Sequence, residues 1–201
     1  MIMDDMFTYT AQNISQAVSH FIDNQNLNGS IKQIDHELAE QFCSAINRII
    51  NSSSIEHSKR ETQNWQWTEI QVAEDYNIGI LHIYAGKHIP IHDHPGSFGL
   101  LYILQGELQL KQYQVKESRL HLTDLELLST QDLKESEFTD FSPHKGNIHS
   151  LHANNGDVFI LDILVSPYSI YERQWFLPID STEINQPSFT TASMKKKMCF
   201  N

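Results

Sequence analysis

The sequence predicts a mainly β protein, an antiparallel barrel or sandwich, with α-helices added at the N-terminus. Residues 10–50 carry apolar side chains at helical spacings of three and four, whereas apolar and polar residues alternate with period two from Trp65 onward. Short strand-like segments then recur, separated by turns that contain glycine. With 201 residues, the chain is long enough to bury one core and carry an appendage.

Two helices are expected within residues 10–50. The first covers residues 12–23 and ends before Asn28-Gly29. Ser30 is a suitable N-cap for the second helix, with Gln33 three residues later as in a capping box. A stripe at spacings of three and four most often packs against a core, and the second helix carries such a stripe: Ile31, Ile34, Leu38, Phe42, Ile46 and Ile49.

A polar, serine-rich linker over residues 51–63 leads into the strands. Alternating segments are expected over residues 65–71 and 78–84, and a strand-like stretch divided by Gly106 over residues 100–113. Residues 115–141 are more acidic and less regular, so loops and a hairpin are expected there. The sequence thus divides into a helical segment, a barrel and a C-terminal tail, over residues 1–60, 61–180 and 181–201.

The run VFILDILV, residues 158–165, is bounded by Gly156-Asp157 and Ser166-Pro167. Such a short run of β-branched and large apolar residues predicts a strand that is buried on both faces. Asp162 lies in its middle, where a carboxylate is costly unless it is paired or hydrogen-bonded.

Composition excludes several classes of protein. The net charge of −11 disfavours nucleic acid, and no stretch approaches the ~18 apolar residues of a membrane span. No secretory signal is recognisable at the N-terminus. Cys43 and Cys199 are poorly placed for a disulfide, which fits a reducing compartment. A soluble, cytoplasmic monomer is expected.

Three histidines form the candidate metal site. In an extended segment, His92 and His94 point to the same side while Asp93 points away, and His149 is the best third ligand. Three imidazoles can hold one divalent metal and leave positions open for substrates. The pair taken alone could equally be structural, since the chain holds 11 histidines.

The spacing around these histidines resembles the two motifs of the cupin family. That resemblance implies a double-stranded β-helix, a jelly-roll barrel that binds metal inside. Gly99 stands where the usual cupin has a glutamate ligand, so the site would hold three neutral histidines and no carboxylate. The matching positions are Gly86, His92, His94, Gly99 and Gly106 in the first motif, and Pro143, Gly146 and His149 in the second.

A cupin site with three histidines and without that glutamate is typical of thiol dioxygenases. Among these, the chain most closely resembles the cysteamine (2-aminoethanethiol) dioxygenase and plant cysteine oxidase group. The likeness is carried by residues 89–96, 146–149 and 161–169, in that order. The likeness implies Fe(II) as the cofactor, a thiol and O₂ as the substrates, and a sulfinic acid as the product. On ligand type alone zinc would suit the three histidines equally well, so the choice of iron rests on the resemblance.

Two further residues are candidates for the chemistry. In a functional role, Asp162 would orient a ligand histidine or bind a substrate amine. In a purely structural role, it would hydrogen-bond to a neighbouring backbone group or to Arg173. The resemblance places Tyr168 beside the active site, where its phenol would bond to bound oxygen or substrate, or it packs at the rim.

The distribution of cations bears on the substrate. An amino-acid carboxylate is best bound by an arginine fork, yet no arginine occurs between Arg60 and Arg119. This favours cysteamine or the N-terminal cysteine of a peptide over free cysteine or 3-mercaptopropionate, unless Arg60, Lys87 or Arg173 folds near the site. A cupin that acts on another substrate and a non-catalytic ligand-binding cupin are the alternatives.

Overall fold

The structure, a computed structural model, describes residues 2–25, 36–51, 63–72, 76–119, 122–165, 173–178 and 188–193. Two helices precede the strands, and they are α1 (Ile2–Gln25) and α2 (His36–Asn51). The strands are β1 (Trp65–Val72), β2 (Tyr76–Ile83), β3 (His88–His92), β4 (Phe98–Gln105), β5 (Glu107–Arg119), β6 (Leu122–Lys134), β7 (Phe138–Phe141), β8 (Ile148–His152), β9 (Val158–Val165), β10 (Gln174–Pro178) and β11 (Ser188–Ser193).

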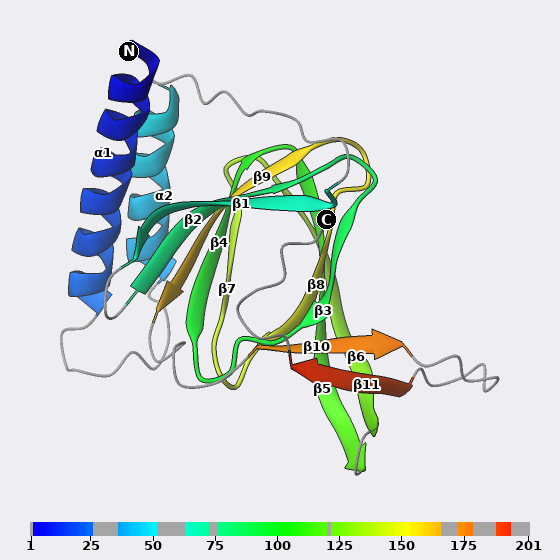
Figure 1. Ribbon diagram of the computed structural model, residues 1–201. Helices are drawn as coiled ribbons and strands as arrows, with labels where there is room; N and C mark the ends of the chain where they lie inside the picture. Colours follow the sequence, from blue (N-terminus) through cyan, green and yellow to red (C-terminus); the bar gives the residue numbers. More distant parts are fainter. Residues whose placement is uncertain are drawn as a thin grey trace.

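These strands form two antiparallel sheets that face each other (Figure 1). The first has the order β1-β2-β9-β4-β7, with β9 in its centre. The second has the order β10-β11-β6-β5-β8-β3 and closes on itself because β3 also pairs with β10, where Trp175 lies opposite His92. The predicted mainly β barrel with N-terminal helices is confirmed.

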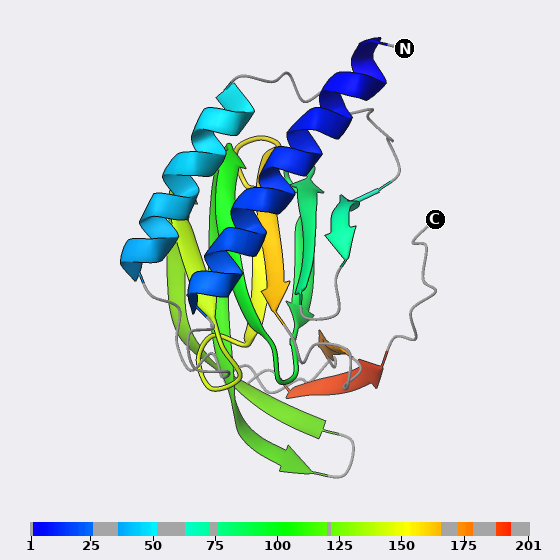
Figure 2. The ribbon, with the colours of Figure 1, turned by 90° about the vertical axis from the view of Figure 1, so that its left-hand side faces the viewer.

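The two helices cover the outer face of the first sheet, as Figure 2 shows. Alternation along the strands sends one set of side chains outward to the helices and the other into the barrel. On β9, Leu161 and Ile163 pack against the helices, whereas Ile160 and Leu164 line the barrel interior. Burial on both faces explains why β9 is apolar at nearly every position, as the sequence predicts.

The long β5–β6 hairpin projects beyond the rest of the barrel (Figure 1). It begins at Gly106, whose φ of 92° suits glycine, and a Cβ there would collide with the carbonyl oxygen of Asp157. The hairpin expected within residues 115–141 is present, because β5 and β6 pair there as antiparallel strands. The loops expected beside it are wrong for most of the range, since β6 and β7 fill it as strands.

The helix boundaries also differ from the prediction. The first helix begins at Ile2, well before residue 12, and the described part of the second begins at His36. The proposed cap at Ser30 and Cys199 lie outside the described residues, whereas Cys43 is a buried free thiol. No helix in the described ranges combines the length and the apolar character that crossing a membrane requires.

The division of the chain at residues 60 and 180 stays a prediction. Strand β11, however, lies within the predicted C-terminal tail, and it pairs with both β10 and β6. The second sheet therefore draws one of its strands from beyond residue 180.

We expect Ile46→Ala to destabilise the protein, because Ile46 of α2 is fully buried in the cluster that joins the helices to the first sheet. The loss of three carbons from a packed core should lower the free energy of unfolding by about 2–4 kcal/mol. Chemical denaturation measures this, with the exposed Glu40→Ala on the same helix as the control. Equal stabilities of the two variants would show that α2 does not seal this core.

Candidate metal centre

Strand register places two of the predicted ligands side by side. His92 is the last residue of β3 and His149 is the second residue of β8, and the two lie directly opposite each other in the antiparallel pair. Their ring centroids are 4.7 Å apart and both side chains are buried. The second sheet therefore brings together residues that are far apart in the sequence.

His94 reaches the same point from outside a strand, since β3 ends at His92. The prediction that His92 and His94 alternate along one strand is wrong, although their rings do converge. Asn147 holds His94 in place: its Oδ1 accepts from the His94 backbone N–H at 2.8 Å, and its Nδ2 donates to the His94 carbonyl at 2.7 Å. Asp93 ties the same turn to β10, because its Oδ1 accepts from the Gln174 N–H at 2.6 Å.

The three imidazoles offer ligand atoms that all lie within 4.8 Å of one another. Backbone carbonyls orient two of the rings. His92 Nδ1 donates to the Pro90 carbonyl at 2.8 Å, and His149 Nδ1 donates to the Gly146 carbonyl at 3.0 Å. Each ring therefore carries its hydrogen on Nδ1 and has a free lone pair on Nε2, which is the form that binds a metal.

The third ring has the opposite tautomer. Arg173 Nη2 donates to His94 Nδ1 at 3.1 Å, so that nitrogen is an acceptor and the hydrogen lies on Nε2. From there it points to His92 Nε2, 3.1 Å away. A metal on His94 Nε2 requires this hydrogen to move to Nδ1. The donor set fits a divalent cation once that single tautomer has changed.

Burial keeps all three histidines uncharged at neutral pH. It is the main cause that lowers the pKa of His92 and His94 well below 6.5 and that of His149 to about 4. Arg173 lowers each of them further. Neutral imidazoles bind metal without first losing a proton.

No carboxylate joins this cluster among the described residues. Gly99, where the usual cupin has glutamate, faces the barrel interior on β4, and a side chain there would collide with the ring of Phe141. That ring lies against two of the histidines, with centroids 4.9 Å from His94 and 5.1 Å from His149. An apolar ring therefore occupies the position from which a fourth ligand would come.

Asp162 lies inside the barrel, on β9 between Gly79 of β2 and Leu101 of β4. It is buried, and its Oδ1 has no hydrogen-bond partner among the described residues. Burial raises the pKa of Asp162 to about 7, while the charge of Arg173 opposes that rise. The carboxyl group is therefore poised to hold or release a proton near neutral pH.

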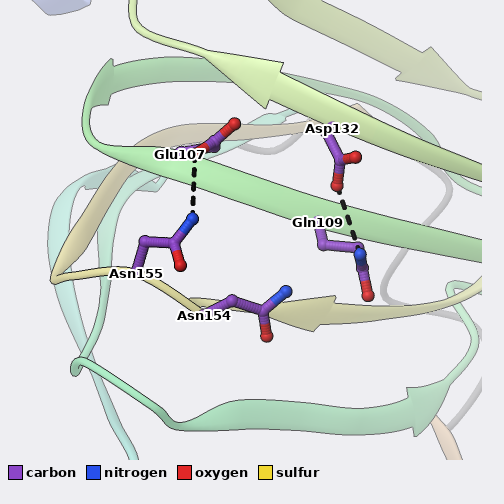
Figure 3. A pocket seen from close by; sticks show the side chains of 5 residues that line it. All are labelled: Glu107, Gln109, Asp132, Asn154 and Asn155. Carbon is purple, nitrogen blue, oxygen red and sulfur yellow. Dashed lines mark hydrogen bonds between the residues drawn. The ribbon is translucent and has the colours of Figure 1, made fainter.

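A polar hollow of about 200 Å³ lies elsewhere, lined by five acid and amide side chains (Figure 3). Asn155 donates to Glu107 at 3.1 Å and Gln109 donates to Asp132 at 3.2 Å, so these groups largely satisfy one another. Asn155 follows the end of β8, whereas His149 lies near its start. The hollow contains none of the predicted site residues.

Comparison with known proteins agrees with this geometry. A family model described as PCO_ADO matches residues 27–198, most of the chain. The chain belongs to the PCO_ADO family. This confirms the family that the sequence resemblance predicted.

Two curated relatives are both named 2-aminoethanethiol dioxygenase. The chain is 28% identical to the Mus musculus protein over 124 residues, which cover 51% of this chain and 48% of the relative. It is 28% identical to the Homo sapiens protein over 126 residues, covering 51% and 47%. The matches thus span about half the length of each relative.

Among solved structures, the chain is similar to the cupin domain of Schizosaccharomyces pombe Cnp3. The TM-score is 0.39 and the identity 16%, over 51% of this chain and 65% of that one. A similarity of this size is too weak to support an inference about function.

For this PCO_ADO protein, the structure brings together the three histidines that the sequence singled out, and it places Arg173 beside them. Tyr168 lies outside the described residues, so its role stays a prediction. Sequence reasoning missed Asn147 and Phe141. Asn147 has a recognisable signal, since it precedes His149 by two residues within the second motif.

We expect Asn147→Ala to weaken metal binding, because His94 would lose both hydrogen bonds that fix its backbone. Residues that orient metal ligands typically contribute a factor of about 10–100 in affinity. Titration with Co(II) or Zn(II) against a chromophoric chelator measures the change. Asn155→Ala, at the far end of β8, is the matched control, and equal affinities for the two variants would remove Asn147 from this role.

Asp162→Asn should stabilise the protein above neutral pH. The folded-state pKa of about 7 lies above the ordinary 3.8, so stability that is present at low pH is lost as the pH rises through 7. In chelator, the variant should exceed the wild type by about 2–4 kcal/mol at pH 8 and by little at pH 4. Denaturation at both pH values measures this, with the exposed Asp132→Asn as control. A difference independent of pH would contradict the raised pKa.

Proposed function

We propose that this protein is a non-haem iron(II) thiol dioxygenase. It would add both atoms of O₂ to the sulfur of a small aminothiol or an N-terminal cysteine and so form a sulfinic acid. The observation that carries the proposal is the set of three buried, neutral histidines whose fourth neighbour is a phenylalanine ring instead of a carboxylate. Membership of the PCO_ADO family supports the same reaction.

The reaction balances without a further reductant. A thiol and one O₂ give a sulfinic acid, so that sulfur loses four electrons and the two oxygen atoms gain them. An iron(II) ion on His92, His94 and His149 would lower the pKa of the thiol and supply electrons to O₂. Since all three ligands are neutral, the charge of that ion would be left for the anionic thiolate to balance.

The remaining residues would orient the reactants and exclude water. The carbonyls of Pro90 and Gly146 fix the rings of His92 and His149. Phe141 covers one side of the site, and Trp175 covers another with its ring centroid 5.0 Å from that of His92. These apolar walls would strengthen electrostatic interactions inside the site.

Asp162 is the residue we assign to proton or amine binding. Its buried Oδ1 is unpaired among the described residues and its pKa is about 7. It would therefore accept the proton that the thiol loses, or bind the ammonium group of an aminothiol. Tyr168 would complete the site by a hydrogen bond to bound oxygen or substrate.

Oxygen uptake tests the proposal. Anaerobically prepared protein loaded with Fe(II) should consume O₂ with cysteamine or a peptide that begins with cysteine, and mass spectrometry should find a product heavier by two oxygen atoms. His149→Ala should abolish uptake and metal retention, whereas the exposed His144→Ala on the preceding loop should change neither. No uptake across the thiol panel, or full activity with zinc instead of iron, would contradict the proposal.

A further inference from the structure

A guanidinium group lies beside the three histidines. Arg173 immediately precedes β10, and its Nη2 is 3.1 Å from His94 Nδ1 although the two residues are 79 positions apart in the sequence. Its side chain carries five N–H donors in a planar fork. Within the described residues, its one hydrogen bond goes to His94, and no carboxylate lies within ion-pair distance of it.

The bond from Arg173 to His94 cannot persist when the site holds a cation. A cation on His94 Nε2 requires the ring hydrogen to sit on Nδ1, and an N–H group cannot accept from a guanidinium donor. Arg173 must then find other acceptors. Arg173 is half-buried, so water can reach its donors only in part, and an acceptor inside the loaded site would lower the cost of leaving them unpaired.

The described part of the protein supplies only some of the acceptors that Arg173 would need. Asp93 already accepts from the Gln174 N–H through Oδ1. Asp162 lies close enough to Arg173 for each charge to affect the pKa of the other, and its Oδ1 is unpaired among the described residues. Asp93 also lies close enough to affect the pKa of Arg173, but neither carboxylate comes within ion-pair distance of it in the described part of the chain, so donors of the fork remain for a bound ligand.

The three groups together match one arrangement of ligand atoms. The histidines would receive a thiolate through their metal, and Asp162 would receive an ammonium group. Arg173 would receive an oxygen acceptor close to both. Cysteamine offers the first two groups and has no oxygen. A cysteinyl group offers all three, because the α-carbon that bears its amine also bears an acyl group, whose oxygen can accept a hydrogen bond.

We propose that Arg173 is the specificity-determining residue of this site, and that it binds the acyl oxygen of a cysteinyl substrate in preference to cysteamine. The acyl oxygen is either the carboxylate of free cysteine or the first carbonyl of a peptide that begins with cysteine. The inference rests on the proposed thiol dioxygenase function. It also qualifies the expectation from the arginine-poor stretch before Arg119, since the cation comes from the opposite end of the chain.

Binding and turnover of a matched thiol series test the inference. The series is cysteamine, L-cysteine, L-cysteinamide and 3-mercaptopropionate, so that the acyl oxygen and the amine are removed separately. Dissociation constants come from the thiolate-to-metal absorption of Co(II)-loaded protein without O₂, and selectivity comes from oxygen uptake by the Fe(II) form. The variants are Arg173→Gln, Arg173→Lys and, as a matched control, Arg48→Gln on the exposed face of α2.

Arg173→Gln should weaken binding of L-cysteine and L-cysteinamide by about 10- to 100-fold, the effect of losing a charged hydrogen bond. Cysteamine should change by less than about threefold, because it makes no such bond. Arg173→Lys should restore part of the loss and Arg48→Gln should change nothing. A larger loss for L-cysteine than for L-cysteinamide identifies the carboxylate as the acceptor, and equal losses identify the carbonyl.

The outcomes separate this inference from the function on which it rests. If Arg173 only holds His94 in place, its loss will weaken all four thiols by one common factor, and the specificity role falls while thiol oxidation stands. Unchanged binding in Arg173→Gln has the same meaning. If the wild-type protein neither binds nor oxidises any thiol of the series, both the proposed function and the role of Arg173 are wrong.

Discussion

The antiparallel pairing of β3 with β8 is the constraint on which the site depends. It sets His92 directly opposite His149 inside the barrel, where water cannot solvate a charged ring. Burial then keeps both imidazoles neutral, and backbone carbonyls leave their Nε2 lone pairs free. A slip of one residue in that register would turn one ring to the outer face and separate the pair.

Neutral ligands make the remaining charges of the interior decisive. Asp162 comes from the first sheet and Arg173 from the segment before β10, so the two opposite charges come from different elements, and Arg173 contacts His94. Each is costly to bury alone, and each offsets part of the cost of the other. Their combined presence distinguishes this interior from a purely apolar barrel core.

Phe141 explains why the site stops at three ligands. Its ring occupies the space in front of Gly99 and packs against His94 and His149. The packing of β4 against β7 therefore leaves no room for a carboxylate at position 99, because the Phe141 ring fills that space. Membership of the PCO_ADO family is consistent with this arrangement, while the matched relatives are covered over only about half their length.

Period-two alternation in the sequence predicted the mainly β fold, and the resemblance to the cupin motifs predicted the three histidines and the missing glutamate, because both are local patterns. The sequence placed β9 correctly for the same reason, since burial on both faces leaves an unbroken apolar run. Only the tertiary structure decided which residue holds the backbone of His94 and which arginine side chain contacts its ring. Asn147 and Arg173 act across strand pairs, and a contact between residues 79 positions apart leaves no periodic trace in the sequence.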